Sequence, residues 1–437
     1  MSIALPADGI AVHAPSRRRT LELLLGALLW LTGIAGAFDF VEPSPYEIMG
    51  LVTIVVFAVS GLALRASLIP LSALLILYVI GFGIAVVPVL DQPKTLMWVM
   101  VSLFMAMTTL FFAAMLGTNT EERLKLLMRG YMVAAVIAAL AGIVGYFHLV
   151  PGASGLFLLY DRARGTFNDP NVLGAFLVLP ALLALQRVLS QRFIEAARSA
   201  LLLLLLVAGL FLSFSRGAWG QFAFSAALMM FLTFVTSHAR ERMRIVLFAA
   251  LAVMVLAAAI AILLSIPQVA DLFNQRAALE QSYDEGPTGR FGRHVLGLLL
   301  ALDTPLGIGP LQFHNLFPED PHNAYLNAFM SGGWLSGFAY LTLVAVTLVS
   351  GLRFVFIATP WRATYIAVYS AFVGVAGESL IIDTDHWRHY FLILGVLWGL
   401  MSVSHGRLKV RRRGQIPPVH APAAAMRPSL ARAAASS

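Results

Sequence analysis

Apolar residues in this chain occur in long uninterrupted runs, and the polar residues gather between those runs. A helix needs roughly 20 apolar residues to cross a bilayer, whereas a membrane β-barrel shows alternating segments of about ten residues. Runs of the helical kind predict spans at residues 21–41, 48–64, 68–90, 96–116, 131–150, 171–189, 199–214, 217–236, 245–265, 323–349, 363–382 and 390–404. The pattern therefore predicts an all-α polytopic integral membrane protein with about twelve transmembrane helices.

The composition excludes a soluble fold. Hydrophobic residues make up 59% of the 437 residues and charged residues only 12%, against roughly 25% charged residues in soluble domains. The chain has no cysteine, which excludes disulfides and thiol chemistry as well.

Basic residues collect in every second predicted loop. The series consists of Arg17, Arg18, Arg19, Arg65, Arg123, Lys125, Arg129, Arg187, Arg192, Arg198, Arg240, Arg242, Arg244, Arg353, Arg362, Arg407, Lys409, Arg411, Arg412 and Arg413. Since basic residues beside spans are retained in the cytoplasm, both termini are predicted to be cytoplasmic. The net charge of +8 follows from this topology. It indicates contact with anionic membrane lipids and no nucleic-acid partner.

The chain divides into three segments. We expect a cytoplasmic N-terminal tail at 1–20, a transmembrane domain at 21–404 that contains a non-cytoplasmic loop at 266–322, and a disordered basic cytoplasmic tail at 405–437. A cleavable signal peptide ending at Ala35, Gly36 and Ala37 is an alternative for the first span. The length of that apolar run favours a span.

Polar residues on the non-cytoplasmic side are informative, because the retention of basic loops in the cytoplasm does not explain an arginine on that side. In RARGTFNDPN (162–171), Pro170 and Asn171 favour a helix start, and Arg164 beside that start suits an anion. A turn with incidental arginines is the structural alternative. In SFSRGAWGQ (213–221), Arg216 stands where two apolar helices turn, and it suits either an anionic partner or anchoring at the interface.

The predicted loop at 266–322 carries further candidates. Arg290 and Arg293 lie in GPTGRFGRH, and the stretch 290–302 can form a helix along the membrane interface. His322 and Asn323 stand at the start of the next span. Histidine is the side chain best suited to accept a proton near neutral pH, although an interfacial histidine can also serve as a cap.

A last polar cluster, ESLIIDTDHWRHYF, follows the eleventh span and contains Glu378, Asp383, Asp385, His386, Arg388 and His389. The cluster lacks the i, i+4 histidine pair of helical zinc motifs. We therefore expect no metal and no cofactor, and we interpret Arg388 as packing against the carboxylates of this cluster.

These motifs, in this order, resemble the O-antigen ligase and O-antigen polymerase family of bacterial membrane glycosyltransferases. The resemblance extends over about residues 160–400. Its carrying motifs are RGTFNDPN (164–171), SFSRG (213–217), TGR (288–290), GIGP (307–310), HNAYL (322–326) and GGWLSG (332–337).

The resemblance implies an enzyme of the bacterial inner membrane whose active site faces the periplasm. Its donor would be a glycan on undecaprenyl diphosphate, and its acceptor lipid A core or a second carrier-linked glycan. By motif, the diphosphate-binding arginines correspond to Arg216 and Arg290, with Arg164 as a weaker correspondence, and the essential histidine corresponds to His322. Asn171, Asn323 and Arg293 are expected to support them. The chemistry agrees, because guanidinium groups can hold a leaving diphosphate without a metal and a histidine base gives direct, inverting displacement.

Three functions stay open at this point. The loop at 266–322 is short for an enzyme that grips a bulky core oligosaccharide, so a ligase and a polymerase of O-antigen or exopolysaccharide both fit. A transporter without chemistry would show several charged residues inside its spans, and the spans here have almost none.

Overall fold

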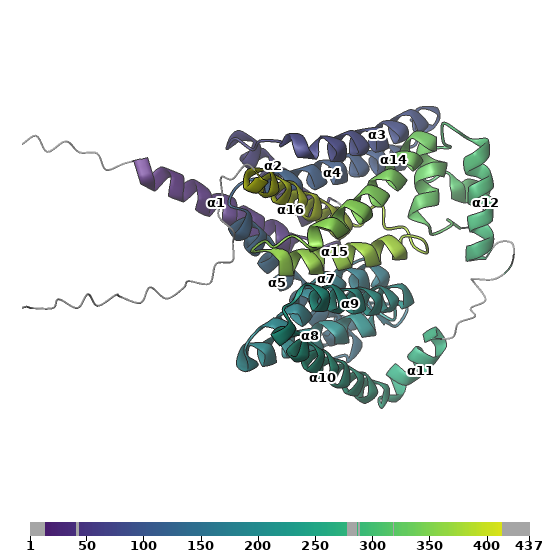
Figure 1. Cartoon of the computed structure of the whole chain (residues 1–437). Coiled ribbons are helices and arrows are strands. Elements are labelled where there is room, and N and C mark those ends of the chain that lie inside the picture. The colour runs from purple at the N-terminus through teal and green to yellow at the C-terminus, as the bar shows by residue number, and fades with distance from the viewer. Residues whose placement is uncertain (1–13, 41–42, 278–285, 287–288, 318, 413–437) are drawn as a thin grey trace, which may run out of the picture.

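The computed structural model describes residues 14–40, 43–277, 286, 289–317 and 319–412, and these residues are almost entirely helical (Figure 1). The helices at the predicted spans are α1 (Ala14–Ala35), α2 (Pro45–Val59), α3 (Ile69–Ala85), α4 (Pro93–Met115), α5 (Thr120–Tyr146), α7 (Pro170–Ser190), α8 (Phe193–Leu212), α9 (Arg216–Thr236), α10 (Ala239–Leu264), α14 (Ala324–Val355), α15 (Arg362–Glu378) and α16 (Arg388–Arg412). The shorter elements are η1 (Ala66–Leu68), η2 (Val87–Val89), α6 (Ala153–Phe157), β1 (Leu158–Leu159), β2 (Arg162–Ala163), α11 (Pro267–Ala277), α12 (Arg290–Asp303) and α13 (Phe313–Leu316).

Eight helices in the described part of the chain are long and apolar enough to cross a membrane. They are α3 with η1, α4, α5, α7, α8, α9, α10 and α14. The remaining four predicted spans also coincide with helices, namely α1, α2, α15 and α16. The all-α, polytopic membrane class predicted from the sequence is therefore confirmed.

Helices α1 and α16 run from the predicted spans into the segments predicted as tails. Helix α1 begins at Ala14, inside the segment 1–20 predicted as a tail, and α16 continues to Arg412, past the predicted end at 404. Residues 1–13 and 413–437 lie outside the described residues.

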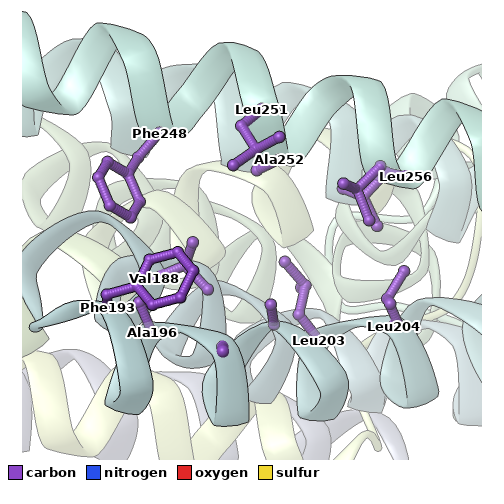
Figure 2. A pocket seen from close by; sticks show the side chains of 12 residues that line it. Val188, Phe193, Ala196, Leu203, Leu204, Phe248, Leu251, Ala252 and Leu256 are labelled. Carbon is purple, nitrogen blue, oxygen red and sulfur yellow. The ribbon is translucent and has the colours of Figure 1, made fainter.

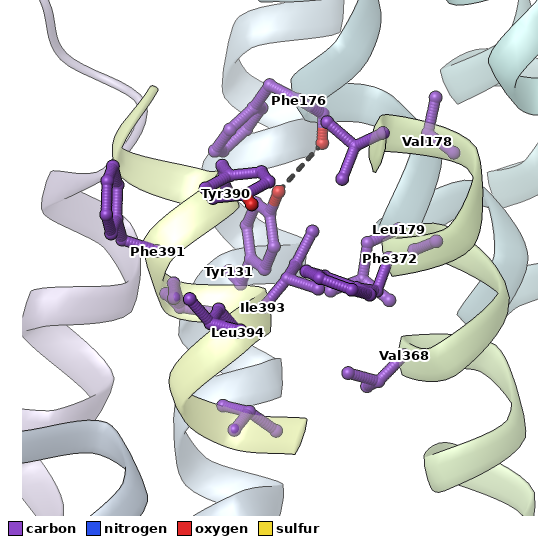
Figure 3. Packing of buried hydrophobic residues seen from close by; sticks show 14 of the residues in the cluster. Tyr131, Phe176, Val178, Leu179, Val368, Phe372, Tyr390, Phe391, Ile393 and Leu394 are labelled. Atoms are coloured by element: carbon purple, nitrogen blue, oxygen red, sulfur yellow. Dashed lines mark hydrogen bonds between the residues drawn. The ribbon is translucent and has the colours of Figure 1, made fainter. Parts of the chain in front are cut away.

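The core centres on α7, which packs against α8, α9 and α15. In the apolar stretch of α7 that is long enough to cross a membrane, 83% of the residues are buried within the protein. The corresponding share for α10 is 6%, so most side chains of α10 are available to contact lipid. Figure 3 shows residues of α5, α7, α15 and α16 meeting in this core. The hydroxyl of Tyr131 on α5 donates to the carbonyl of Phe176 on α7 at 3.0 Å, so the buried phenol is satisfied.

The segment predicted as the large loop contains three helices, α11, α12 and α13. The predicted helix at 290–302 is confirmed as α12, with Arg293, Gly297 and Ala301 buried. Its opposite face exposes five large apolar residues, namely Phe291, Val295, Leu298, Leu299 and Leu302. In Figure 1, α12 lies across the end of the bundle opposite the start of α1.

Helix α14 is kinked where the segment after α12 docks onto it. Gly333 has φ +70° and ψ −176°, and a Cβ there would lie 2.6 Å from the carbonyl oxygen of Pro305. The amide of Trp334 donates to that same carbonyl at 2.8 Å, and the amide of Ile308 donates to the carbonyl of Met330 at 2.8 Å. The loop that contains GIGP thus packs against the part of α14 that contains GGWLSG. This contact positions the segment that runs from the loop to His322.

The prediction that Arg388 packs against the carboxylates of its own cluster was wrong, because its salt-bridge partners come from elsewhere in the chain. Arg388 donates from Nε to Glu47 at 2.6 Å and from Nη1 to Asp39, rather than to Asp383 or Asp385 of its own cluster. These contacts join the start of α16 to the start of α2, through Glu47, and to the segment before α2, through Asp39. A carboxylate from a distant element is closer in space than those nearby in sequence.

Candidate active site

A cavity of about 450 Å³ opens where α7, α9 and α12 begin and α15 ends. Its lining consists of Leu159, Tyr160, Arg162, Asp169, Pro170, Asn171, Phe214, Ser215, Arg216, Gly217, Arg276, Arg290, Glu319, His322, Glu378, Ile381 and Ile382. Four of the sequence-derived site residues, Asn171, Arg216, Arg290 and His322, thus face one cavity. Arg164, Arg293 and Asn323 are not among its lining residues.

The first wall of the cavity is the start of α7. Asp169 is the N-cap, and its side chain accepts from the amide of Asn171 at 2.6 Å, as the predicted helix start requires. Arg162, 8% exposed, donates to the side-chain oxygen of Asn171 at 2.8 Å and to the carbonyl of Ser213 at 2.8 Å. It therefore ties the start of α7 to the end of α8.

Arg162, and not Arg164, is the arginine of this motif that lines the cavity. Strands β1 and β2 form a two-residue hairpin in which Leu159 pairs with Arg162, and this turn brings Arg162 inward. Arg164 follows the hairpin, and its Nε donates to the carbonyl of Leu156 at 3.2 Å. The sequence did not separate the two arginines, because the hairpin is only two residues long on each side.

Arg216 is the first residue of α9. Helix α8 ends at Leu212, Phe214 takes a left-handed conformation with φ +47°, and Ser215 caps α9 by accepting from the amide of Ala218 at 3.3 Å. The predicted turn between two helices is thus present, and it directs Arg216 into the cavity.

Two further arginines come from the segment after α10. Arg276 lies in the last turn of α11, and Arg290 is the first residue of α12. Both line the cavity. No specific role was predicted for Arg276, because nothing in its local sequence distinguishes it from an ordinary helix-end cation.

Arg293 holds the turn that precedes His322. Its side chain is 2% exposed and donates from Nη1 to the carboxylate of Glu319 at 2.6 Å and to the carbonyl of Asp320 at 3.0 Å. Asn323, the N-cap of α14, accepts from the amides of Tyr325 and Leu326 at 3.0 Å each. Both residues therefore fix the backbone on either side of His322 rather than lining the cavity.

His322 meets Asp383, a residue 61 positions further along the chain. The imidazole Nδ1 lies 2.9 Å from Oδ2 of Asp383, and the backbone of His322 has φ +51°. The hydrogen bond that Nδ1 donates to Asp383 raises the pKa of His322, while partial burial opposes that rise. With Nδ1 bound to a carboxylate, Nε2 is the ring nitrogen left to accept a proton.

Among the described residues that line the cavity, cationic side chains outnumber carboxylates. Four of these residues are arginines, against the three carboxylates Asp169, Glu319 and Glu378. Asp169 is engaged by the amide of Asn171, and Glu319 by Arg293. Such a wall of guanidinium groups suits an anion with several oxygens, and a diphosphate is one.

A second cavity, of about 210 Å³, lies between α8 and α10 (Figure 2). All of its lining residues are apolar, including Phe193, Leu203 and Phe248. It offers no group for acid, base or anion chemistry, and we assign the chemistry to the arginine-lined cavity.

Comparison with known proteins agrees with this assignment at the level of the family. Residues 201–342 match the family model described as O-Antigen ligase, and a search of curated proteins found no match. The matched segment includes Arg216, Arg290 and His322, and it ends before Glu378 and Asp383. Residues 201–342 are therefore similar to the O-antigen ligase family.

Proposed function

We propose that this chain is an O-antigen ligase that transfers a glycan from undecaprenyl diphosphate to a hydroxyl of lipid A core at the periplasmic face of the inner membrane. The family match supports an enzyme of the ligase and polymerase type. The observation that carries the finer proposal is the single cavity that gathers Arg216, Arg290 and His322, with His322 bound to Asp383.

The arginines act on the donor. When the bond between the anomeric carbon and the phosphate oxygen breaks, its electron pair leaves with the diphosphate, and negative charge grows on that oxygen. Arg216 and Arg290 offer forked donors that match two phosphate oxygens, and Arg276 adds charge from α11. No metal is needed for this neutralisation in the proposed mechanism.

His322 acts on the acceptor. An attacking hydroxyl forms the new bond to the anomeric carbon and must lose its proton, which Nε2 of His322 accepts. Asp383 keeps the proton of the neutral imidazole on Nδ1 and stabilises the imidazolium that forms. Because the hydroxyl attacks from the face opposite the diphosphate, the anomeric centre is inverted. A base of this kind contributes about 10² to 10⁴ in rate.

Gene deletion tests the proposal in cells. We expect surface polysaccharide on gels to lose the long chains attached to lipid A core, while carrier-linked polymer accumulates. Lipid A core capped by a single repeat would instead show a polymerase, and an unchanged profile would refute both activities.

A further inference from the structure

Among the described residues that line the cavity, Glu378 is the one acidic residue for which neither capping nor a salt bridge gives a role. It is the last residue of α15 and is 4% exposed. Within the described part of the chain, neither Oε1 nor Oε2 has a hydrogen-bond partner. A buried carboxylate without partners is costly, and hydrogen-bond donors of a bound ligand would remove that cost.

The carboxylate lies against the first turn of α9. A Cβ built on Gly217 would lie only 2.6 Å from Oε1 of Glu378 and 3.4 Å from its Cδ. Glycine at this position therefore leaves the space that the carboxylate occupies. Gly217 follows Arg216 directly, so Glu378 sits beside an arginine to which we assign diphosphate binding.

The chemistry of Glu378 indicates which part of the donor it meets. When its two oxygens accept hydrogen bonds from a ligand, the carboxylate is held in its ionised form, and in that form it repels a diphosphate, which also only accepts hydrogen bonds. A sugar presents hydroxyl donors on neighbouring carbons, and the two oxygens of one carboxylate can accept from a pair of them. The sugar joined to the diphosphate must lie next to the phosphate-binding arginines.

We propose that Glu378 accepts hydrogen bonds from hydroxyl groups of the donor sugar directly linked to the diphosphate, and that it thereby selects that sugar. The inference rests on the proposed function, since it places the diphosphate at the arginines. It adds a sugar-binding group that lies outside the segment matched by the family model.

Lipid binding to the purified full chain tests the inference with two probes, undecaprenyl diphosphate and undecaprenyl diphosphate glucose. The wild type is expected to bind the glucose conjugate more tightly than the bare lipid. Glu378→Gln should keep its affinity for the bare lipid and lose at least about ten-fold for the conjugate, because an amide replaces a charged acceptor. Glu195→Gln, the same change at an exposed position of α8, should behave as wild type.

Glu378→Asp is the control for a folding defect. It keeps the carboxylate and shortens the side chain by one methylene group. This variant should bind the bare lipid normally and the conjugate with an intermediate affinity. The inference on Glu378 is overturned if glucose adds no affinity in the wild type, or if Glu378→Gln retains the full increment. Failure of the wild type to bind the bare lipid would instead refute the proposed function.

Discussion

Replacing Asp383 by asparagine removes the charge from the partner of His322 and keeps its shape. The hydrogen bond between Nδ1 and Oδ2 is 2.9 Å long, and only 32% of the Asp383 side chain is exposed. A hydrogen bond to a charged group contributes about 1.5–3 kcal/mol. The loss of this bond should therefore slow transfer by roughly 10- to 100-fold, at about 1.4 kcal/mol per factor of ten, and lower the pKa of His322.

The sign of the pH effect follows from the role of the base. His322 must be neutral to accept a proton, and Asp383 raises its pKa. Wild-type activity is therefore lost as the pH falls through that raised value. In Asp383→Asn the acidic limb should move to lower pH, while the plateau falls by about 10- to 100-fold because the imidazolium formed in the transition state has lost its partner.

The assay is kcat/KM for transfer by the purified enzyme across the pH range in which histidine titrates. Asp91→Asn, at an exposed position before α4, is the matched control and should show the wild-type profile. An acidic limb that stays in place, or that moves to higher pH, would refute the assignment of His322 as the base held by Asp383.

Further variants test the other roles. Arg216→Lys should lose most transfer at normal expression, because an ammonium cannot contact two phosphate oxygens as a guanidinium fork does; wild-type rates would reduce Arg216 to an interface anchor. His322→Ala should lose about 10² to 10⁴ in turnover and still bind the donor, so retention of more than about a tenth would remove the base assignment. Arg290→Ala should weaken donor binding as well as turnover. A cysteine at the exposed position 315 in α13 should react with an impermeant thiol reagent from the periplasmic side, and protection until lysis would reverse the topology.

The helices could be predicted from the sequence because each leaves a local signal. An apolar run is contiguous, and the start of α7 is marked by the adjacent residues Asp169 and Pro170. The motif positions of Arg216, Arg290 and His322 likewise anticipated three residues that face one cavity.

The contacts between distant elements left no such signal. His322 and Asp383 are 61 positions apart, and Arg388 finds its partners at the opposite end of the chain. Arg162 lines the cavity in place of the predicted Arg164 because of a hairpin whose strands are too short to show an alternating strand pattern in the sequence. Glu378 stood in a cluster interpreted as packing, and its burial against Gly217 depends on how α9 and α15 meet.

The positions of Arg216 and Arg290 at the starts of their helices are a second indication that the ligand is an anion. Each is the first residue of its helix, and neither α9 nor α12 has an acidic residue in its first turn. The macrodipole puts partial positive charge at a helix N-terminus, so a cation there is disfavoured by about 0.3–1 kcal/mol and an anion is favoured by a similar amount. Local preference would put aspartate or glutamate at both positions. Positions that break a local rule are expected at functional sites. A bound polyanion turns both unfavourable terms into favourable ones, since the guanidinium groups and the positive end of the helix dipole can then act on the same charge.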